Sequence, residues 1–314
     1  NSEQAFDWTN QQLEQLSGLK LDGVLEFPQL QKLCLGPINF PHHTPNLIHL
    51  ERMGTTSIHT SLSYFPKLEV LKLHGNSVII NEESVLRHLT IRDQQLSDDF
   101  LQSIISKCPM LESLQLFSVF SPVQPVQHEE TSFVGYQCTT LNHLKISPVN
   151  DGPKLLNSIS EAFPNLRSLH IGFCSKLTNQ DVQQCLQKCP RIIHLELPFC
   201  PQISDSLLKT IGQKHNSIQT LSLFGKNISP TGLNHLHNCS SLKCLILKGT
   251  DYTIGPSDVL QELRNKGIEV YCASPMRTRP VTSKISCLVC FLSVNADEYD
   301  RHLEQHKDVD PYTL

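Results

Sequence analysis

The sequence predicts an α/β solenoid in which every repeat supplies one strand and one helix. Short apolar triplets with strand spacing recur four times, and their first members step along the chain by 26, 26 and 24 residues. These first members are Leu166, Ile192, Ile218 and Leu242. The segments between triplets carry signals for a helix, and one strand plus one helix per fixed period is the pattern of stacked repeats.

The helix signals follow the triplets at a regular place. An apolar residue and then a hydroxyl residue of the helix-capping type come after the first three triplets, with the hydroxyl at Thr178, Ser204 and Ser229. Pro230 suits a first helical turn, where its missing N–H is not needed. Apolar residues with helical spacing follow, so we expect helices on one side of the repeats and strands on the other.

The cysteines keep to the same period. Cys174 and Cys200 each lie eight residues after the first apolar position of a repeat, and Cys108, Cys189 and Cys239 each lie three residues before one. This arrangement resembles the cysteine-containing leucine-rich repeat, found mainly in F-box/leucine-rich-repeat proteins, the substrate-recognition subunits of cullin ubiquitin ligases. The resemblance is close over 97–249, looser over 13–91 and absent beyond about residue 273. It implies a leucine-rich-repeat solenoid with parallel strands on the concave face and helices on the convex face.

The chain divides into a long solenoid and a small module. We expect the solenoid to span 1–272, with degenerate short repeats over 13–91 and cysteine-type repeats over 97–272. In the first part the triplets are too close for a full helix between strands, and residues 1–15, with the only tryptophan, Trp8, are expected to cap the end of the core. Residues 273–284 lack apolar periodicity and are interpreted as a linker before a module at 285–310.

Composition favours a soluble protein in a reducing compartment. The formal net charge of -4 gives no global attraction to nucleic acid or anionic membrane, and there is no secretory signal and no apolar run of membrane-spanning length. Twelve cysteines include five that keep the repeat period, where a thiol can fill the core. We therefore expect reduced thiols and a cytoplasmic or nuclear location. The chain begins with Asn1, which suggests a fragment, and no F-box-like module precedes the repeats.

Two surfaces of the solenoid are candidates for binding a protein substrate. The residues between the last two apolar positions of each triplet should face the concave side, and they include Lys145, His170 and Glu196, a mixture of charges that argues against phosphate binding. An aromatic residue follows the strand in four repeats, at Phe117, Phe173, Phe199 and Phe224. These rings either pack into the strand-to-loop shoulder or form an apolar recognition patch. The segment 117–140 is either a plain long loop or a binding loop beside the concave face.

The C-terminal module carries a zinc motif. Cys287 and Cys290 form a C-x2-C pair, and eleven residues later His302 and His306 stand four apart, on one face of a helix. Two thiolates and two imidazoles complete a tetrahedral zinc site, and a module this small needs the metal to fold. The sequence predicts zinc as the cofactor.

The charge on the predicted finger helix argues against duplex binding. The predicted helix and its flanks carry five acidic residues and two basic ones. The acidic residues are Asp297, Glu298, Asp300, Glu304 and Asp308, and the basic ones are Arg301 and Lys307. The eleven-residue spacing is similar to that of the ubiquitin-binding zinc fingers of the type in DNA polymerase eta, which carry an acidic residue two places after the first histidine. Glu304 matches that place, although the family has aspartate. The resemblance implies ubiquitin as a partner; a purely structural or partner-docking finger is the alternative.

These observations lead to two function hypotheses. The first is a protein-interaction scaffold, the substrate-recognition component of an SCF-type ubiquitin ligase, which would contact the cullin-ligase adaptor through a segment absent from this sequence. The second is a nucleic-acid-associated zinc-finger protein whose repeats dock protein partners. No nucleophile–base set and no phosphate-binding glycine loop is present in the sequence, so we do not expect an enzyme.

Overall fold

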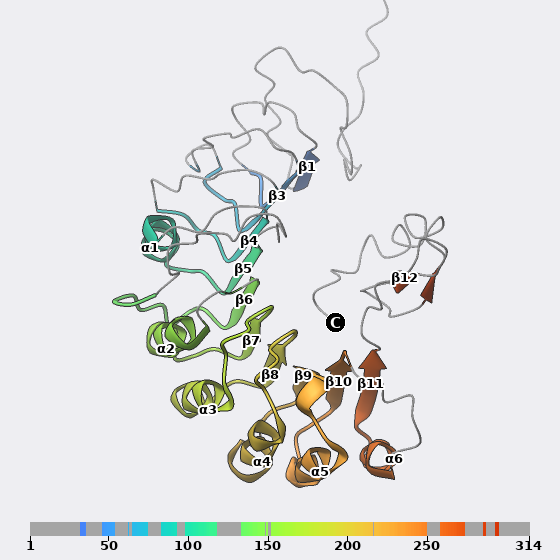
Figure 1. Ribbon diagram of the computed structural model, residues 1–314. Helices are drawn as coiled ribbons and strands as arrows, with labels where there is room; N and C mark the ends of the chain where they lie inside the picture. The colour runs from blue at the N-terminus through green and yellow to red at the C-terminus, as the bar shows by residue number, and fades with distance from the viewer. Residues whose placement is uncertain are drawn as a thin grey trace, which may run out of the picture.

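The computed structural model describes a curved stack of repeats with a small separate hairpin (Figure 1). The described residues are 32–35, 46–53, 62, 65–74, 83–92, 98–117, 133–147, 149, 152–215, 217–249, 258–273, 285–286 and 293–294. The predicted cap at 1–15, most of the loop 117–140, most of the linker and nearly all of the zinc module lie outside them. The predictions made for those segments remain predictions.

Eleven strands form one parallel sheet, and their order in the sheet is their order in the chain. The strands are β1 Lys32–Leu35, β2 His49–Met53, β3 Val70–His74, β4 His88–Arg92, β5 Ser113–Phe117, β6 His143–Ser147, β7 Ser168–Ile171, β8 His194–Leu197, β9 Thr220–Phe224, β10 Cys244–Lys248 and β11 Glu269–Ala273. Each predicted triplet in 166–247 contributes one strand. The prediction of an α/β chain with parallel repeat strands is confirmed.

The register of the sheet stacks equivalent leucines of successive repeats. Leu144 is opposite Leu169, which is followed across the sheet by Leu195, Leu221 and Leu245. All five are buried, at 0 to 1% exposure. Because side chains alternate along a strand, this register places the residues between the leucines on the opposite, inner side of the arc.

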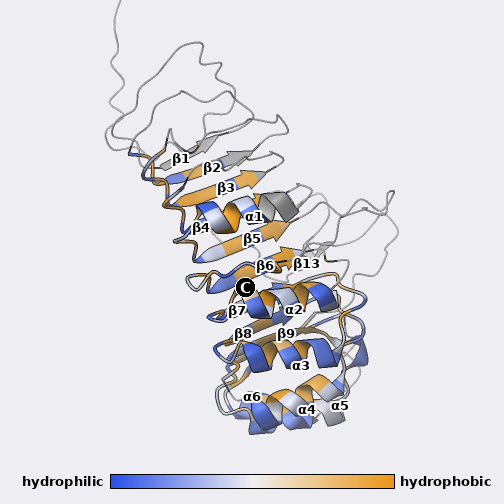
Figure 2. Cartoon of the chain, turned by 90° about the vertical axis from the view of Figure 1, so that its left-hand side faces the viewer, coloured by the Kyte–Doolittle hydropathy of each residue, from blue (hydrophilic) through white to orange (hydrophobic). Residues whose placement is uncertain are grey.

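Helices cover the outer side of the sheet from the middle of the chain onward (Figures 1 and 2). They are α1 Asp98–Lys107, α2 Gly152–Ala162, α3 Asn179–Lys188, α4 Asp205–Lys214, α5 Pro230–Leu233 and α6 Asp258–Asn265, with 3-10 segments η2 Gly225–Asn227 and η3 Asn234–Asn238. Their apolar sides face the sheet, and their polar sides form the outer surface in Figure 2. Among the described residues none of the strands β1 to β3 is followed directly by an α-helix, as the close triplet spacing predicts, and α1 is the helix that follows β4.

The predicted helix caps are present, with one difference. Thr178 forms a capping box with Asp181, and the Ser229 hydroxyl accepts a hydrogen bond from the Gly232 N–H, with Pro230 in the first turn. Ser204 occupies the equivalent N-cap position of α4 without a side-chain cap bond. Its backbone N–H instead donates to Asn179 Oδ1 (3.0 Å), so this residue joins one repeat to the previous one.

Two helical segments differ from expectation. Sequence reasoning missed α2, although Leu155, Leu156 and Ile159 have helical spacing and are buried. The helix expected through Leu233 and Leu236 is a short α-helix that continues as a 3-10 segment. Gly and Asn have low helix propensity, and both occur where the helix changes, at Gly232 and Asn234.

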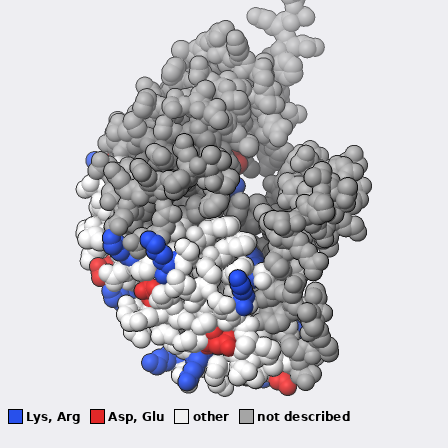
Figure 3. Space-filling view, viewed as in Figure 1, with Lys and Arg blue, Asp and Glu red and all other residues white. Residues whose placement is uncertain are grey.

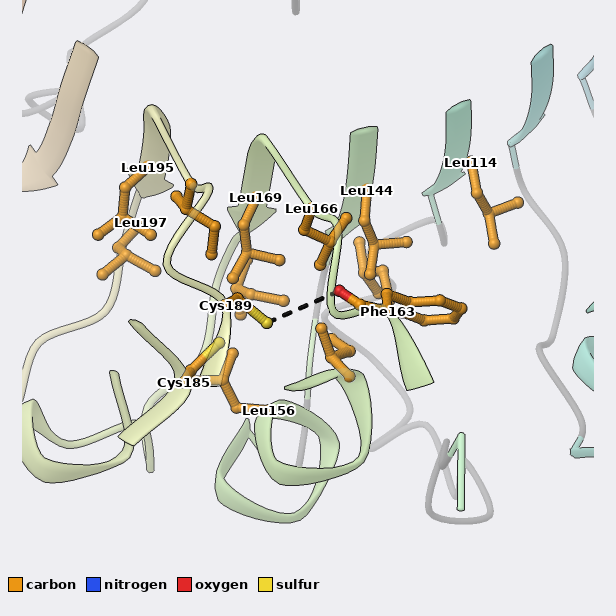
Figure 4. Close-up of a cluster of buried hydrophobic side chains, with 14 of the residues drawn as sticks. Leu114, Leu144, Leu156, Phe163, Leu166, Leu169, Cys185, Cys189, Leu195 and Leu197 are labelled. Atoms are coloured by element: carbon orange, nitrogen blue, oxygen red, sulfur yellow. Dashed lines mark hydrogen bonds between the residues drawn. The ribbon is translucent and has the colours of Figure 1, made fainter. Parts of the chain in front are cut away.

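The cysteines with the repeat period fill the core as reduced thiols (Figure 4). Cys108, Cys174, Cys189 and Cys200 are 0% exposed and Cys239 is 5% exposed. The Cys189 thiol donates to the Phe163 carbonyl (3.7 Å), the contact drawn in Figure 4. Burial raises the pKa of Cys108 and Cys200 to about 12, so these thiols stay protonated and unreactive. Their role is packing.

No helix in the described part of the chain is long and apolar enough to cross a membrane.

Candidate protein-interaction surface

The three ionisable residues predicted for the concave face lie side by side on its central column. Lys145 is opposite His170, and His170 is opposite Glu196, on strands β6, β7 and β8. The His170 Nδ1 lies 2.9 Å from Glu196 Oε2. The column is more crowded than expected, because Lys145 is only 2% exposed and His170 8%. Strands about 4.8 Å apart bring long side chains of one column into contact, so the column is packed as well as inward-facing.

The column is electrostatically balanced around Glu196. Burial alone would raise the pKa of Glu196, but the hydrogen bond with His170 and the nearby Lys145 and Lys248 together lower it. Burial lowers the pKa of His170, against the opposing effect of Glu196, and burial lowers the pKa of Lys248. At neutral pH the pair is therefore a carboxylate that accepts a hydrogen bond from a neutral imidazole, with two lysines close by.

Two further histidines face the same side of the sheet. Burial, followed by the charge of Lys145, lowers the pKa of His143, and burial also lowers the pKa of His194. Both therefore resist protonation at neutral pH. Acidification would add charge to a face that already carries lysines.

Three of the four predicted aromatic residues form a continuous stack, which we call the aromatic ridge: Phe173, Phe199 and Phe224. The rings of Phe173 and Phe199 are stacked at 4.4 Å and 15°, and those of Phe199 and Phe224 lie 5.3 Å apart. Phe173 is 48% exposed and Phe199 36%. The ridge follows the carboxyl ends of β7 to β9. It presents ring surface to solvent instead of burying it in the shoulder of the repeats.

The backbone at two members of the ridge is strained. Phe173 and Phe199 have φ of 54° and 55°, the left-handed region that a bulky side chain rarely adopts. The Phe173 N–H donates to the Pro198 carbonyl (2.9 Å), and the next residue of each repeat, Cys174 or Cys200, is fully buried. The chain thus turns sharply from the strand to bring the thiol into the core, and this turn directs the preceding ring outward. Such strain costs about 1–3 kcal/mol and often marks a functional surface.

Glycine residues allow close packing at both ends of the aromatic ridge. A Cβ atom on Gly249 would lie 2.2 Å from the Phe224 ring, and a Cβ on Gly172 would lie 2.6 Å from Ser147 Oγ. Glycine at these two places therefore lets the ring and the neighbouring strand approach. The ridge is built into the repeat packing and does not depend on a surface loop.

Phe117 belongs to a different contact from the ridge. It ends strand β5, and the guanidinium carbon of Arg92 and the ammonium of Lys145 lie 5.1 Å and 5.6 Å from its ring centroid. Cation–π contacts contribute about 0.5–1 kcal/mol at exposed sites and about 2 kcal/mol when the cation is desolvated, as the buried Lys145 is. The expectation of one aromatic at an equivalent place in four repeats is thus too simple. Phe117 and Phe224 end strands, whereas Phe173 and Phe199 lie one residue further along their repeats.

Sequence reasoning missed two cations of this surface, Arg92 and Lys248. They occupy the last positions of β4 and β10, opposite Phe117 and Phe224 respectively. The sequence prediction included only the residues between the last two apolar positions of each triplet. The last residue of β4 and of β10, two positions further on, points inward as well. Extending the same alternation by two residues identifies both.

The segment 117–140 is anchored where the structure describes it. Phe133 is fully buried and packs edge-on against Phe163, with ring centroids 4.9 Å apart. Its backbone N–H donates to Ser158 Oγ (3.0 Å). Residues 118–132, which would carry the predicted binding loop, are outside the described part, and their role stays a prediction.

The predicted zinc ligands Cys287, Cys290, His302 and His306, and Glu304 beside them, are also outside the described residues. The structure does describe β12 Ile285–Ser286 and β13 Ser293–Val294, which pair antiparallel. The two strands flank the segment with both cysteines. Within the described residues, no group of three or more His, Cys, Asp or Glu side chains is arranged to hold a metal ion.

Comparison with known proteins finds distant relatives, one named a BTB/POZ domain-containing protein and one named an F-box/LRR-repeat protein. No protein-family model matches the chain. The chain is similar to the BTB/POZ domain-containing protein FBL11 of Arabidopsis thaliana, 27% identical over 157 residues, covering 49% of this chain and 16% of that protein. It is also similar to the putative F-box/LRR-repeat protein 23 of Arabidopsis thaliana, 27% identical over 170 residues, covering 49% of this chain and 36% of that protein. The match spans about a third or less of each relative, and it supports an F-box/LRR-like repeat protein.

Proposed function

We propose that this chain is a protein-interaction scaffold and that it serves as the substrate-recognition component of an SCF-type ubiquitin ligase. One observation carries the proposal: two successive repeats hold phenylalanine rings on the surface through a left-handed backbone. The turn that brings Cys174 and Cys200 into the core could be made by glycine without strain, whereas phenylalanine at this position adds an exposed ring. Exposed aromatic side chains on a rigid repeat surface are typical of protein-binding sites.

The ligase part of the proposal draws on similarity. One of the relatives described above is named an F-box/LRR-repeat protein and another a BTB/POZ domain-containing protein. The cysteines that keep the repeat period resemble those of F-box/leucine-rich-repeat proteins, and they are core residues with protonated thiols. In this role the chain binds a protein substrate and catalyses no reaction itself.

We also propose that Cys287, Cys290, His302 and His306 hold one zinc ion, with Glu304 on a surface for ubiquitin. The pairing of β12 with β13 joins both ends of the segment that contains the two cysteines, as a metal-binding turn requires. Two thiolates with two imidazoles suit zinc, which would supply structural cross-linking and no chemistry. The acidic neighbours of these ligands favour a protein partner over nucleic acid.

The experiment that tests ligase membership uses the natural full-length protein. Tagged protein purified from its own cells should carry the cullin-ligase adaptor and a cullin in near-stoichiometric amounts. A matched leucine-rich-repeat protein of another class, purified in parallel, gives the background. Purification without adaptor or cullin above that background would refute the ligase role, and would leave the scaffold role to be judged on its own binding data.

A further inference from the structure

The inner face over strands β4 to β10 carries more permanent positive than negative side chains. On these strands the inward positions carry three lysine or arginine side chains, Arg92, Lys145 and Lys248, and one acidic side chain, Glu196. Four histidines lie on the same side, and Glu269 occupies an inward position on the neighbouring strand β11. The chain as a whole has a formal net charge of -4. On the described surface visible in Figure 3, basic and acidic side chains are interspersed. The positive excess over β4 to β10 thus has the opposite sign to the net charge of the chain.

The charges and the aromatic ridge share one edge of the sheet. Arg92 and Lys248 end β4 and β10, and the ridge lies between them at the ends of β7 to β9. Parallel strands place all their carboxyl ends at the same edge. A ligand crossing the strands along this edge would meet a cation, then ring surface, then a second cation.

We propose that this edge of the inner face binds an extended acidic segment of a partner protein, with apolar side chains on the aromatic ridge and carboxylates near Arg92 and Lys248. The inference rests on the proposed scaffold function and names the class of substrate that the scaffold takes. Six strand spacings of about 4.8 Å separate the two cations, or roughly 29 Å along the sheet. An extended peptide rising about 3.3 Å per residue crosses that distance in roughly nine residues.

Protein fits this surface better than nucleic acid does. Glu196 is in the middle of the face and would repel a phosphate backbone, whereas a peptide can place a neutral or basic group there. The rings of Phe173 and Phe199, stacked at 4.4 Å, leave no gap into which a base could insert. The permanent cations are also separated and do not repeat from strand to strand, as a nucleic-acid track would require.

Histidine burial adds support that is independent of the ridge. His143 and His170 both have a lowered pKa, for which burial is the largest cause and Lys145 a further one. A carboxylate arriving at this face would oppose the effect of Lys145 and act in the same direction as Glu196, which already raises the pKa of both histidines. Binding of an acidic segment should therefore strengthen as the pH falls toward 6.

The test measures binding of a labelled acidic peptide to the full chain by fluorescence anisotropy at low salt. The probe has about twelve residues, enough to cover the span worked out above, with aspartates at both ends and Leu and Phe in the centre. A control peptide has asparagine in place of every aspartate. A single-stranded oligonucleotide with the same charge as the probe serves as a second control ligand. The full chain is compared with Arg92→Gln/Lys248→Gln. The matched control is Lys209→Gln/Lys214→Gln, which removes two charges from exposed positions of α4.

The proposal predicts saturable binding of the acidic probe, weakened about five- to tenfold by the inner-face double variant and less than about twofold by the α4 variant. The asparagine peptide should bind at least tenfold more weakly. Equal effects of the two double variants, or tighter binding of the oligonucleotide, would overturn it. Probe binding that appears only after the acidic residues at 297–310 are neutralised would also overturn it, because the surface would then bind the chain's own acidic segment. None of these outcomes depends on the adaptor, so failure here is distinguishable from failure of the ligase role.

Discussion

The ridge makes a stability prediction that separates exposed from buried rings. Phe173→Ala removes a ring that is 48% exposed and stacked on Phe199. A stacked aromatic pair contributes about 0.5–1.5 kcal/mol, and a buried Phe→Ala change costs about 3–5 kcal/mol. With about half of the ring exposed, we expect Phe173→Ala to lower the free energy of unfolding by about 1–2 kcal/mol. Phe163→Ala, at a fully buried ring, should cost about 3–5 kcal/mol.

A second substitution at the same residue isolates the backbone strain. Glycine adopts φ near 54° without steric cost, whereas alanine keeps a Cβ there. We expect Phe173→Gly to be more stable than Phe173→Ala by about 1 kcal/mol, the reverse of the usual order of these residues. Urea unfolding followed by far-UV circular dichroism gives all three values. A Phe173→Ala cost close to that of Phe163→Ala, or a glycine variant less stable than the alanine variant, would refute the reasoning.

Three other predictions follow from the inner face and the C-terminal motif. The Ser222 hydroxyl is fully buried without a hydrogen-bond partner, so Ser222→Ala should raise the free energy of unfolding by about 1 kcal/mol. The control Ser168→Ala, at a half-buried serine, should leave the free energy of unfolding nearly unchanged, and a Ser222→Ala variant less stable than the natural protein would contradict the prediction. Folding lowers the pKa of the inner-face histidines His143, His170 and His194, so the unfolded chain binds protons more readily and the free energy of unfolding should fall from about pH 7 to pH 5. The fall should be less steep in His170→Gln, and a free energy of unfolding that does not change with pH would contradict the prediction. Metal analysis should find one zinc per chain, lost in Cys290→Ser; equal zinc in both proteins would exclude the assignment.

Much of the repeat architecture can be predicted from the sequence because one physical rule is repeated. Buried leucines at fixed strand positions and a capping hydroxyl at a fixed distance specify the strand and helix of each repeat, as at Leu169 and Thr178. The missed helix α2 had a readable signal in Leu155, Leu156 and Ile159, but in the sequence no apolar residue followed by Ser or Thr stands directly before it. The period identified the repeats better than it identified each element.

The features that define the candidate surface were harder to predict. Alternation gives the direction of Lys145 but not its burial, which depends on how closely side chains of adjacent strands cover one another. The left-handed backbone would be expected at Gly172, yet it occurs at Phe173. Gly172 is instead needed for close approach to Ser147. That distinction requires three-dimensional packing between repeats, which one repeat's sequence does not contain.

The most direct test of the central claim compares the proteins retained by the full-length protein and by its Phe173→Ala/Phe199→Ala variant. Both are purified from the natural cells, and the cullin-ligase adaptor serves as the internal standard. The account predicts equal adaptor in both samples, an unchanged fold by circular dichroism, and loss of specific partner proteins, enriched in acidic segments, from the variant. Retention of the same partners in the same amounts by a folded variant would contradict the claim that the aromatic ridge is the recognition surface.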